Sequence, residues 1–178
     1  GILLRLHSLS ETRFSSIPGE IDAVVGAKAG GIEILLGSLN AEGSYPAFLP
    51  YKLFESLKSQ QTITHGDGVA TTPNYIETIT PFVYFARLNH FRVVGTDRSF
   101  FGLAGRLKFL SGQWTDHADH VVVGSLVARD LNLKIGDKIS VQTWVSESST
   151  GQRLELEVSG ILESTKSQWD RLIYGTVG

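Results

Sequence analysis

The stretch that most constrains the fold of this 178-residue chain is residues 119–141, DHVVVGSLVARDLNLKIGDKISV. Three consecutive valines at positions 121–123 are β-branched and apolar, which is typical of a buried strand. Gly124 ends this run, and Ser125 is a candidate N-cap for the short helix that we expect over residues 126–131. The first half of the stretch therefore predicts a strand followed directly by a helix.

The second half of the same stretch predicts a turn and another strand. Residues 133–138 carry Gly-Asp at their centre, and both residue types favour turns. Residues 139–142 alternate between apolar and polar side chains, so we expect a half-buried strand there. The whole stretch contains no catalytic signature.

The rest of the chain indicates many strands and few helices. Apolar residues recur at helical spacing in two segments, residues 1–16 and 51–59. The expected strands cover residues 21–28, 75–88, 91–97, 153–162 and 170–174. Residues 32–39 fit either a strand or a helix, and we favour a strand or an irregular extended segment. We expect a hairpin turn at Asn89-His90, a second one at residues 149–151, and a non-helical turn over residues 98–103. This balance predicts an α+β fold with mixed, strand-rich sheets and few short helices.

Composition excludes several kinds of function. The net charge is −2 with both signs interspersed, so the chain lacks the basic footprint of a nucleic-acid-binding protein. It has no cysteine, which excludes disulfides, thiolate catalysis and cysteine-based zinc sites. No apolar run approaches the roughly 20 residues of a membrane-spanning helix, so we expect any membrane anchor to lie outside this sequence.

One candidate metal site is the cluster of Asp116, His117, Asp119 and His120. Histidine and carboxylate are ligands that zinc prefers. Neighbouring residues at the start of a strand point in opposite directions, so at most two of these side chains share a face. We therefore favour a solvated acidic loop before a buried strand, and we expect no metal.

Two further motifs have a weak chemical interpretation. His65 and Asp67, with His90 elsewhere, are residue types of a hydrolase triad, but the sequence has no Gly-x-Ser-x-Gly elbow. The glycine-rich residues 26–31 follow an expected strand, as phosphate-binding loops do, but match neither the dinucleotide-binding nor the Walker pattern. We interpret them as a strand exit that needs permissive backbone angles.

Aromatic residues concentrate in the middle of the chain. The set comprises Phe82, Tyr84, Phe85, Phe91, Phe100, Phe101, Phe109 and Trp114. Alternation along a strand places Phe82 and Tyr84 on one face and Phe85 on the other. Core packing explains much of this set. The functional alternative is an apolar surface for a partner or cargo, for which the candidate residues are Phe82, Tyr84, Phe100, Phe101 and Trp114.

Four phrases give the chain a family resemblance. They are IDAVVGAKAGGIEILLGSL, FRVVGTDRSFF, LSGQWTDHADHVVVGSLVARDLNLKIGDKISV and VSGILESTKSQWDRLIY, and together they span nearly the whole chain. In these phrases and their order the chain resembles the extracytoplasmic domain of the MacB/LolC–LolE/FtsX superfamily of ABC-transporter permeases. The phrase around residues 121–141 is the most specific.

The resemblance implies a single periplasmic domain over residues 1–178 in an inner-membrane protein, between the first and second transmembrane helices. It also implies a porter-like base and a β-rich lobe, for which we consider a division at about residues 17–100 and 101–178. Residues 1–16 would continue the first membrane helix outward. No catalytic residue and no cofactor carries over to this domain.

The implied function is mechanical. The domain would couple ATP hydrolysis by a cytoplasmic ATPase to export, or to the handling of lipoproteins, lipids or peptides. The implied partners are that ATPase, a second permease subunit in a dimer, and a periplasmic adaptor or lipoprotein. The alternatives are an FtsX-like domain that recruits a partner protein and, less favoured, an extracytoplasmic hydrolase.

Overall fold

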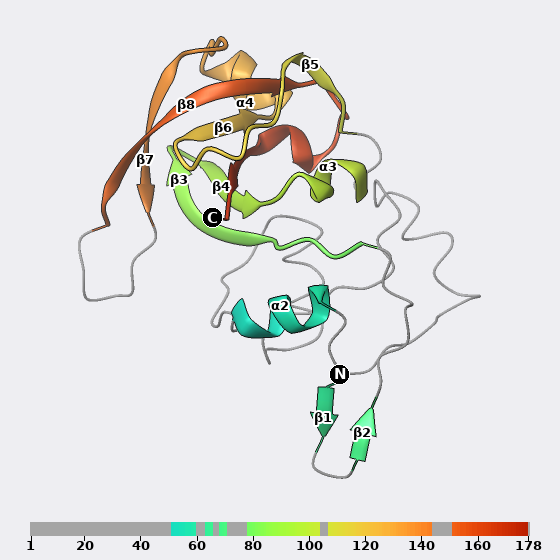
Figure 1. Ribbon diagram of the computed structural model, residues 1–178. Coiled ribbons are helices and arrows are strands. Elements are labelled where there is room, and N and C mark those ends of the chain that lie inside the picture. The colour runs from blue at the N-terminus through green and yellow to red at the C-terminus, as the bar shows by residue number, and fades with distance from the viewer. Residues whose placement is uncertain are drawn as a thin grey trace. The chain divides into compact units, whose positions relative to one another are not determined.

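The structure is a computed structural model of the 178-residue chain (Figure 1). It describes residues 51–59, 63–65, 68–70, 78–103, 107–143 and 151–177. The helix expected over residues 1–16, the strands expected over 21–28 and 32–39, and the glycine-rich residues 26–31 lie outside the described residues. The chain forms two compact units, and for the described residues the division falls between Thr80 and Pro81.

The described part of the first unit contains one helix and one small hairpin. Helix α2, Tyr51–Lys58, confirms the helix expected over residues 51–59. Strand β1, Ile63–His65, pairs antiparallel with β2, Gly68–Ala70. The hairpin was not expected, because each strand has only three residues and shows no long alternation.

The second unit contains the remaining elements. Its strands are β3 (Val83–Leu88), β4 (Phe91–Thr96), β5 (Phe109–Gly112), β6 (His120–Val123), β7 (Lys138–Thr143), β8 (Arg153–Leu162) and β9 (Leu172–Thr176). Its helices are α3 (Ser99–Leu103), α4 (Ser125–Asp130) and the 3-10 helix η1 (Gln168–Arg171). None of the helices in the described ranges has the length and apolar character needed to cross a bilayer.

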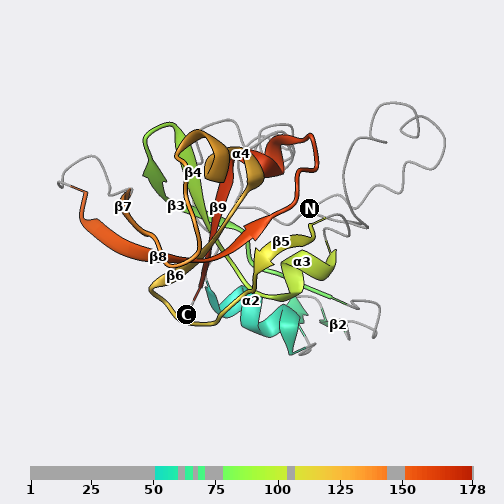
Figure 2. The same ribbon diagram turned by 90° about the horizontal axis from the view of Figure 1, so that it is seen from above.

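The strands of the second unit form a sheet that closes on itself. The order is β5-β8-β6-β9-β4-β3-β7, and β7 pairs again with β8. The ring therefore runs from β8 through β6, β9, β4, β3 and β7 back to β8, with β5 attached to β8 outside it. Pairs β4–β9 and β6–β8 are parallel, whereas the other pairs are antiparallel. The long β8 makes closure possible, because it curves from β7 at its start to β5 at its end (Figures 1 and 2).

The middle strands of the ring are buried on both faces. One row of register partners, Val93, Ile173 and Val123, belongs to the core inside the ring. Helix α4 packs against that core through Val127 and Ala128. The next row, Val94, Tyr174 and Val122, points to the outer face and is also buried. The uninterrupted valines are therefore needed for two apolar layers.

Much of the expected secondary structure is confirmed. The strand–helix–turn–strand order of residues 119–141 is observed as β6, α4, a turn and β7. Strand β8 has the expected bounds, and β3 and β4 form the expected hairpin around Asn89. The second expected hairpin turn, at residues 149–151, lies almost entirely outside the described residues. The fold is strand-rich α+β with a mixed sheet, as predicted.

Four local predictions were wrong. Residues 99–103 form helix α3 rather than a plain turn, because the Asp97 carboxylate accepts from the Ser99 backbone N–H (3.0 Å) and hydroxyl, which caps the helix. The final strand begins at Leu172, since Asp170 belongs to η1. In the strand expected over residues 75–88, β3 begins only at Val83, after Pro81.

The fourth wrong prediction concerns the start of α4. Ser125 is not the N-cap: it is the first helical residue, and Gly124 occupies the cap position without any side-chain hydrogen bond. Gly124 lies against the η1 segment, where a Cβ would stand 2.5 Å from the carbonyl oxygen of Asp170 and 2.8 Å from that of Trp169. The contact requires a residue without a side chain.

The boundary of the units differs from the lobe division considered at residue 100. Strands before and after that position, such as β4 and β9, pair directly in one sheet. Because β4 supplies one wall of the ring, residues 81–100 belong structurally with the rest of the second unit.

We predict that Gly124→Ala lowers the free energy of unfolding by about 1–3 kcal/mol, because the added methyl group must displace backbone atoms. Urea unfolding of the whole chain measures the effect. Gly102→Ala is the matched control, because Gly102 lies exposed in α3 and a Cβ there meets nothing within 4 Å. The Gly102→Ala variant should be as stable as the unchanged chain or more stable. Equal stability of Gly124→Ala and the unchanged chain would contradict the prediction.

Candidate functional site

An aromatic cluster covers the outer face of the middle strands. Tyr174 of β9 is its base, and the rings of Phe100 and Phe101 from α3 lie 5.7 and 5.6 Å from the Tyr174 ring, measured between centroids. Helix α3 follows β4 directly, so the Asp97 cap that starts this helix also aims its two phenylalanines across the sheet.

The cluster extends in two directions from α3. On one side, Phe100 contacts Phe82 (5.4 Å) and Trp169 (5.4 Å), and Phe82 contacts Tyr84 (5.3 Å). On the other side, Phe101 contacts Phe109 (5.4 Å) and Trp114 (5.1 Å). The aromatic cluster thus comprises Phe82, Tyr84, Phe100, Phe101, Phe109, Trp114, Trp169 and Tyr174.

Burial divides the cluster into a packed centre and a rim. Phe100, Trp169 and Tyr174 are buried, with at most 5% of their surface exposed. The other members are half-buried and form the rim: Phe82, Tyr84, Phe101, Phe109 and Trp114. Tilted and edge-to-face contacts of this kind contribute about 0.5–1.5 kcal/mol each beyond the area they bury. The centre therefore stabilises the fold, and the rim is the part that retains accessible apolar surface.

The structure brings together all five residues predicted as a partner or cargo surface. Phe82, Tyr84, Phe101 and Trp114 are on the rim, whereas Phe100 is 2% exposed and has almost no surface to offer. The expected alternation is observed, because Phe85 packs against the inner core on the opposite face.

Sequence reasoning missed two central members, Trp169 and Tyr174. Tyr174 could have been found from alternation, because it follows Leu172 by two residues in a strand whose other face holds Ile173. Trp169 had no such signal, since it precedes the strand in a short 3-10 helix. Its position depends on a hydrogen-bonded loop.

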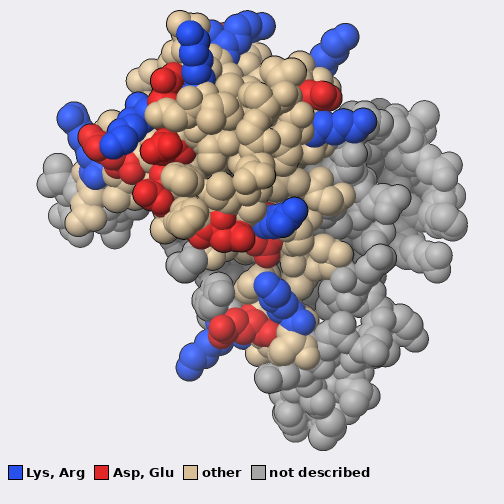
Figure 3. Space-filling model, turned by 45° about the horizontal axis from the view of Figure 1, so that its top comes forward, with Lys and Arg blue, Asp and Glu red and all other residues tan. Residues whose placement is uncertain are grey.

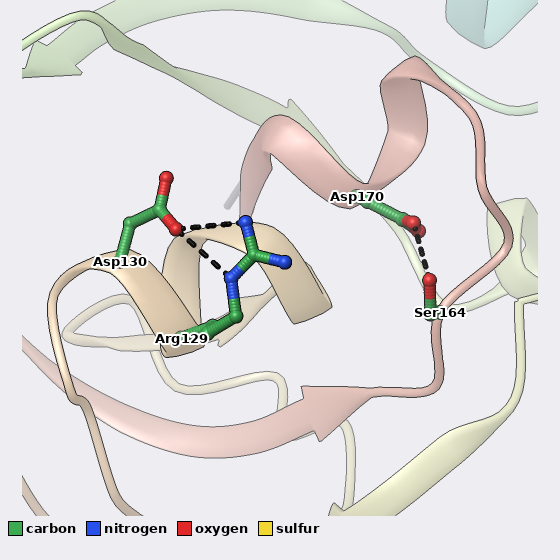
Figure 4. A network of polar contacts seen from close by, with 4 residues as sticks. All are labelled: Arg129, Asp130, Ser164 and Asp170. Carbon is green, nitrogen blue, oxygen red and sulfur yellow. Dashed lines mark hydrogen bonds and ion pairs between the residues drawn. The ribbon is translucent and has the colours of Figure 1, made fainter.

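That loop is organised by the buried carboxylate of Asp170. Its oxygens accept from the Thr165 hydroxyl (2.7 Å), the Ser164 hydroxyl (2.9 Å), and the backbone N–H groups of Thr165 (2.9 Å) and Lys166 (2.9 Å). Figure 4 shows the Ser164 side chain directed at Asp170. Burial acts to raise the pKa of Asp170, but these hydrogen bonds outweigh it and hold the pKa below its ordinary value.

The loop and the aromatic cluster meet at Tyr174. The Tyr174 hydroxyl donates to the carbonyl oxygen of Trp169 at 2.9 Å. Burial, together with the nearby Tyr84 and Asp170, raises the pKa of Tyr174 well above its ordinary value, so the hydroxyl keeps its proton and remains a donor. Asp170 and Tyr174 therefore fix the backbone on which Trp169 is carried.

The exposed ion pair near this loop has a smaller role. On α4, a guanidinium nitrogen of Arg129 lies 3.0 Å from a carboxylate oxygen of Asp130 (Figure 4). The two side chains have 74% and 36% of their surfaces exposed. A pair so accessible to water and salt contributes little to stability. On the face shown in Figure 3, acidic and basic side chains are interspersed around an uncharged area, with no continuous basic surface.

The acidic loop before β6 borders the rim. Asp116 accepts a hydrogen bond from the Trp114 indole N–H (2.7 Å), which fixes the orientation of that ring. The rings of His117 and His120 lie 5.1 Å apart. Across the part of the chain that the structure describes, no three metal-capable side chains gather into one group.

The residues considered for a hydrolase belong to different elements. His65 ends β1 in the first unit, and Asp67 lies outside the described residues. His90 belongs to the β3–β4 turn of the second unit, where its ring lies 4.0 Å from that of Phe91. Ser125 begins α4.

Comparison with known families decides the identity of the domain. The model of the MacB-like periplasmic core domain matches residues 9–176, which is nearly the whole chain. The chain belongs to this family. It is the extracytoplasmic domain of an ABC-transporter permease, a class of protein that works with an ATPase and partner subunits. No curated protein matches the sequence.

In this periplasmic core domain, the phrase around residues 121–141 is part of the packed framework. That phrase builds β6, α4 and β7, and it contains Gly124, against which the Asp170 loop packs. The family phrase is thus structural scaffold, and the accessible aromatic rim lies beside it.

We predict that Asp170→Asn lowers the free energy of unfolding by about 2–3 kcal/mol at pH 7, because the amide nitrogen cannot accept the hydrogen bonds that one carboxylate oxygen now accepts. The folded pKa is lower than the unfolded value near 3.8, so the stabilisation by Asp170 is fully present above that pH. It is lost as the pH falls through the folded pKa.

Urea unfolding of both proteins between pH 7 and pH 2 tests this. The difference between them should be constant down to about pH 4 and should shrink below it. Asp130→Asn is the control, because the Asp130 carboxylate forms the exposed pair with Arg129. If the loss of unfolding free energy caused by Asp170→Asn did not depend on pH, the lowered pKa of Asp170 in the folded state would be contradicted.

Proposed function

We propose that this periplasmic core domain is a non-catalytic module that transmits ATP-driven movement of its permease to cargo on the outer side of the membrane. The observation that carries the proposal is the family match over residues 9–176. The role requires no catalytic group and no cofactor within the domain. The partners would be the cytoplasmic ATPase, acting through the rest of the permease, and a second permease subunit.

The architecture of the second unit supports mechanical transmission. A body that passes on a force must move as one piece, and the ring of strands has no opening between β7 and β8. Both faces of β4, β6 and β9 are packed, and protein interiors of this density transmit strain rather than absorb it. The Gly124–Asp170 contact further joins α4 to the loop before β9.

The rim of the aromatic cluster supports a role in cargo or partner contact. Half-buried aromatic side chains held by a packed centre offer apolar area at a low entropic cost, because their orientations are already fixed. We propose the rim as the surface for a lipoprotein, lipid, peptide or periplasmic adaptor. An FtsX-like recruiting role would use the same surface, but the burial of Phe100 leaves less aromatic area than a recruiting patch over α3 would need.

We predict that ATP changes the distance between the core domains of the two permease subunits but not distances within one domain. These 178 residues contain no cysteine, so introduced cysteines are the only labelling sites within the domain once any cysteines elsewhere in the complex are replaced by serine. Glu155→Cys in each subunit reports the distance between domains, and Glu155→Cys with Arg171→Cys in one subunit reports the internal distance; both residues are exposed. Pulsed electron paramagnetic resonance of the full permease–ATPase complex gives both distances.

The internal pair is the control for rigidity. Transmission predicts that ATP shifts the distance between subunits while the internal distance stays constant. Mechanical transmission by a rigid domain would be contradicted if ATP left the distance between subunits unchanged. It would also be contradicted if ATP changed the internal distance by the same amount as the distance between subunits.

We predict that Trp114→Ala in the full permease impairs transport, because it removes rim surface and the ring contact with Phe101. The measurement is complementation of a strain that lacks the permease, at equal protein levels in the membrane. Leu110→Ala is the control, since Leu110 is 67% exposed on β5 but outside the aromatic cluster. Full complementation by Trp114→Ala would contradict a role for the rim in cargo or partner contact.

A further inference from the structure

Two histidines of the loop before β6 lie side by side. The His120 backbone N–H donates to the His117 carbonyl oxygen at 3.1 Å, which closes a turn. The imidazole centroids are 5.1 Å apart and the rings are tilted by 59°. His117 is exposed and His120 is half-buried, so solvent reaches the pair.

The separation of the rings suits a shared metal ion. An imidazole nitrogen binds Zn²⁺ at about 2.0–2.1 Å, so two imidazoles on one tetrahedral ion have centroids roughly 5 Å apart. The observed centroid separation of 5.1 Å agrees with this value. The exposed His117 ring can turn to present either nitrogen.

An outer hydrogen bond prepares His120 to act as a ligand. The Thr115 hydroxyl oxygen lies 2.9 Å from Nδ1 of His120. When Nδ1 carries the proton and donates to this oxygen, Nε2 is left with a free lone pair and a fixed direction. Ligating histidines commonly have such a partner on the nitrogen that does not bind the metal.

The neighbouring strand supplies a carboxylate on the same face. Glu157 of β8 is the register partner of His120, and its neighbours Leu156 and Val158 belong to the inner core, so Glu157 points outward. The nearby Asp116 is already bonded to Trp114. Among the described residues no group of three metal-capable side chains exists, so the histidines are the two protein ligands and water completes the coordination.

In place of the metal-free loop expected from the sequence, we propose that His117 and His120 form an exchangeable two-histidine site for a divalent ion of the zinc class, with Thr115 as the residue that positions His120. Glu157 adds negative charge nearby, which favours a cation. The site is independent of the transport role, and it accepts ions that imidazole prefers, namely Zn²⁺, Ni²⁺ and Cu²⁺.

The test is calorimetric titration of the metal-free, tag-free chain with zinc chloride. We expect one zinc ion per chain at this site and loss of that binding in His117→Ala and in His120→Ala. Thr115→Val should weaken binding by about 10- to 100-fold, since it removes the hydrogen bond while keeping both ligands. His90→Ala is the control, because His90 is exposed but lies against Phe91 rather than another histidine.

Two readouts distinguish site loss from unfolding. Circular dichroism should show unchanged folding for His117→Ala, whose side chain is exposed. In the unchanged chain, zinc should shift the imidazole resonances of His117 and His120 and not those of His90. Three results would each overturn the proposal. They are absence of zinc binding at millimolar concentration, zinc binding retained by the double variant His117→Ala/His120→Ala, and a zinc affinity of Thr115→Val equal to that of the unchanged chain.

Discussion

The placement of β9 between β4 and β6 is the pairing on which the second unit depends. Ile173 of this strand completes the row of Val93 and Val123 inside the ring. Its neighbour Tyr174 completes the opposite row and supports the aromatic cluster. A slip of one residue would exchange these two side chains between faces, so the register of one short strand specifies both apolar layers.

The same strand connects the scaffold to the accessible surface. The Tyr174 hydroxyl holds the carbonyl of Trp169, and Asp170 gathers the donors of the preceding loop. Through Trp169 and Phe100 these bonds reach Phe82 and the rim. This MacB-like periplasmic core domain therefore presents its aromatic rim from a packed base, which suits the proposed role of a surface that keeps its shape while the domain moves.

The sequence predicted well where one periodic pattern determined the structure. The valine run, the alternating residues 153–162 and the helix after Gly124 all formed as expected, because each buries one regular face. Prediction from the sequence failed where a contact between residues far apart in the chain determines the local structure. Ser125 looked like a cap, but the close approach of the Asp170 backbone sets that position. The aromatic residues were recognised as a set, yet Trp169 joined them only through a loop whose hydrogen bonds leave no periodic signal.

The position of β9 in the chain has a consequence for folding. The strand at the centre of the sheet comes after every strand that it joins, and its partners β4 and β6 are separated from it by long stretches of sequence. Until residues 172–176 are in place, β4 and β6 each lack a neighbour and display unpaired backbone groups. Non-local pairing of this kind is slow. Any partly folded state in which β9 is not yet paired has open, apolar strand edges at β4 and β6, and such edges favour self-association.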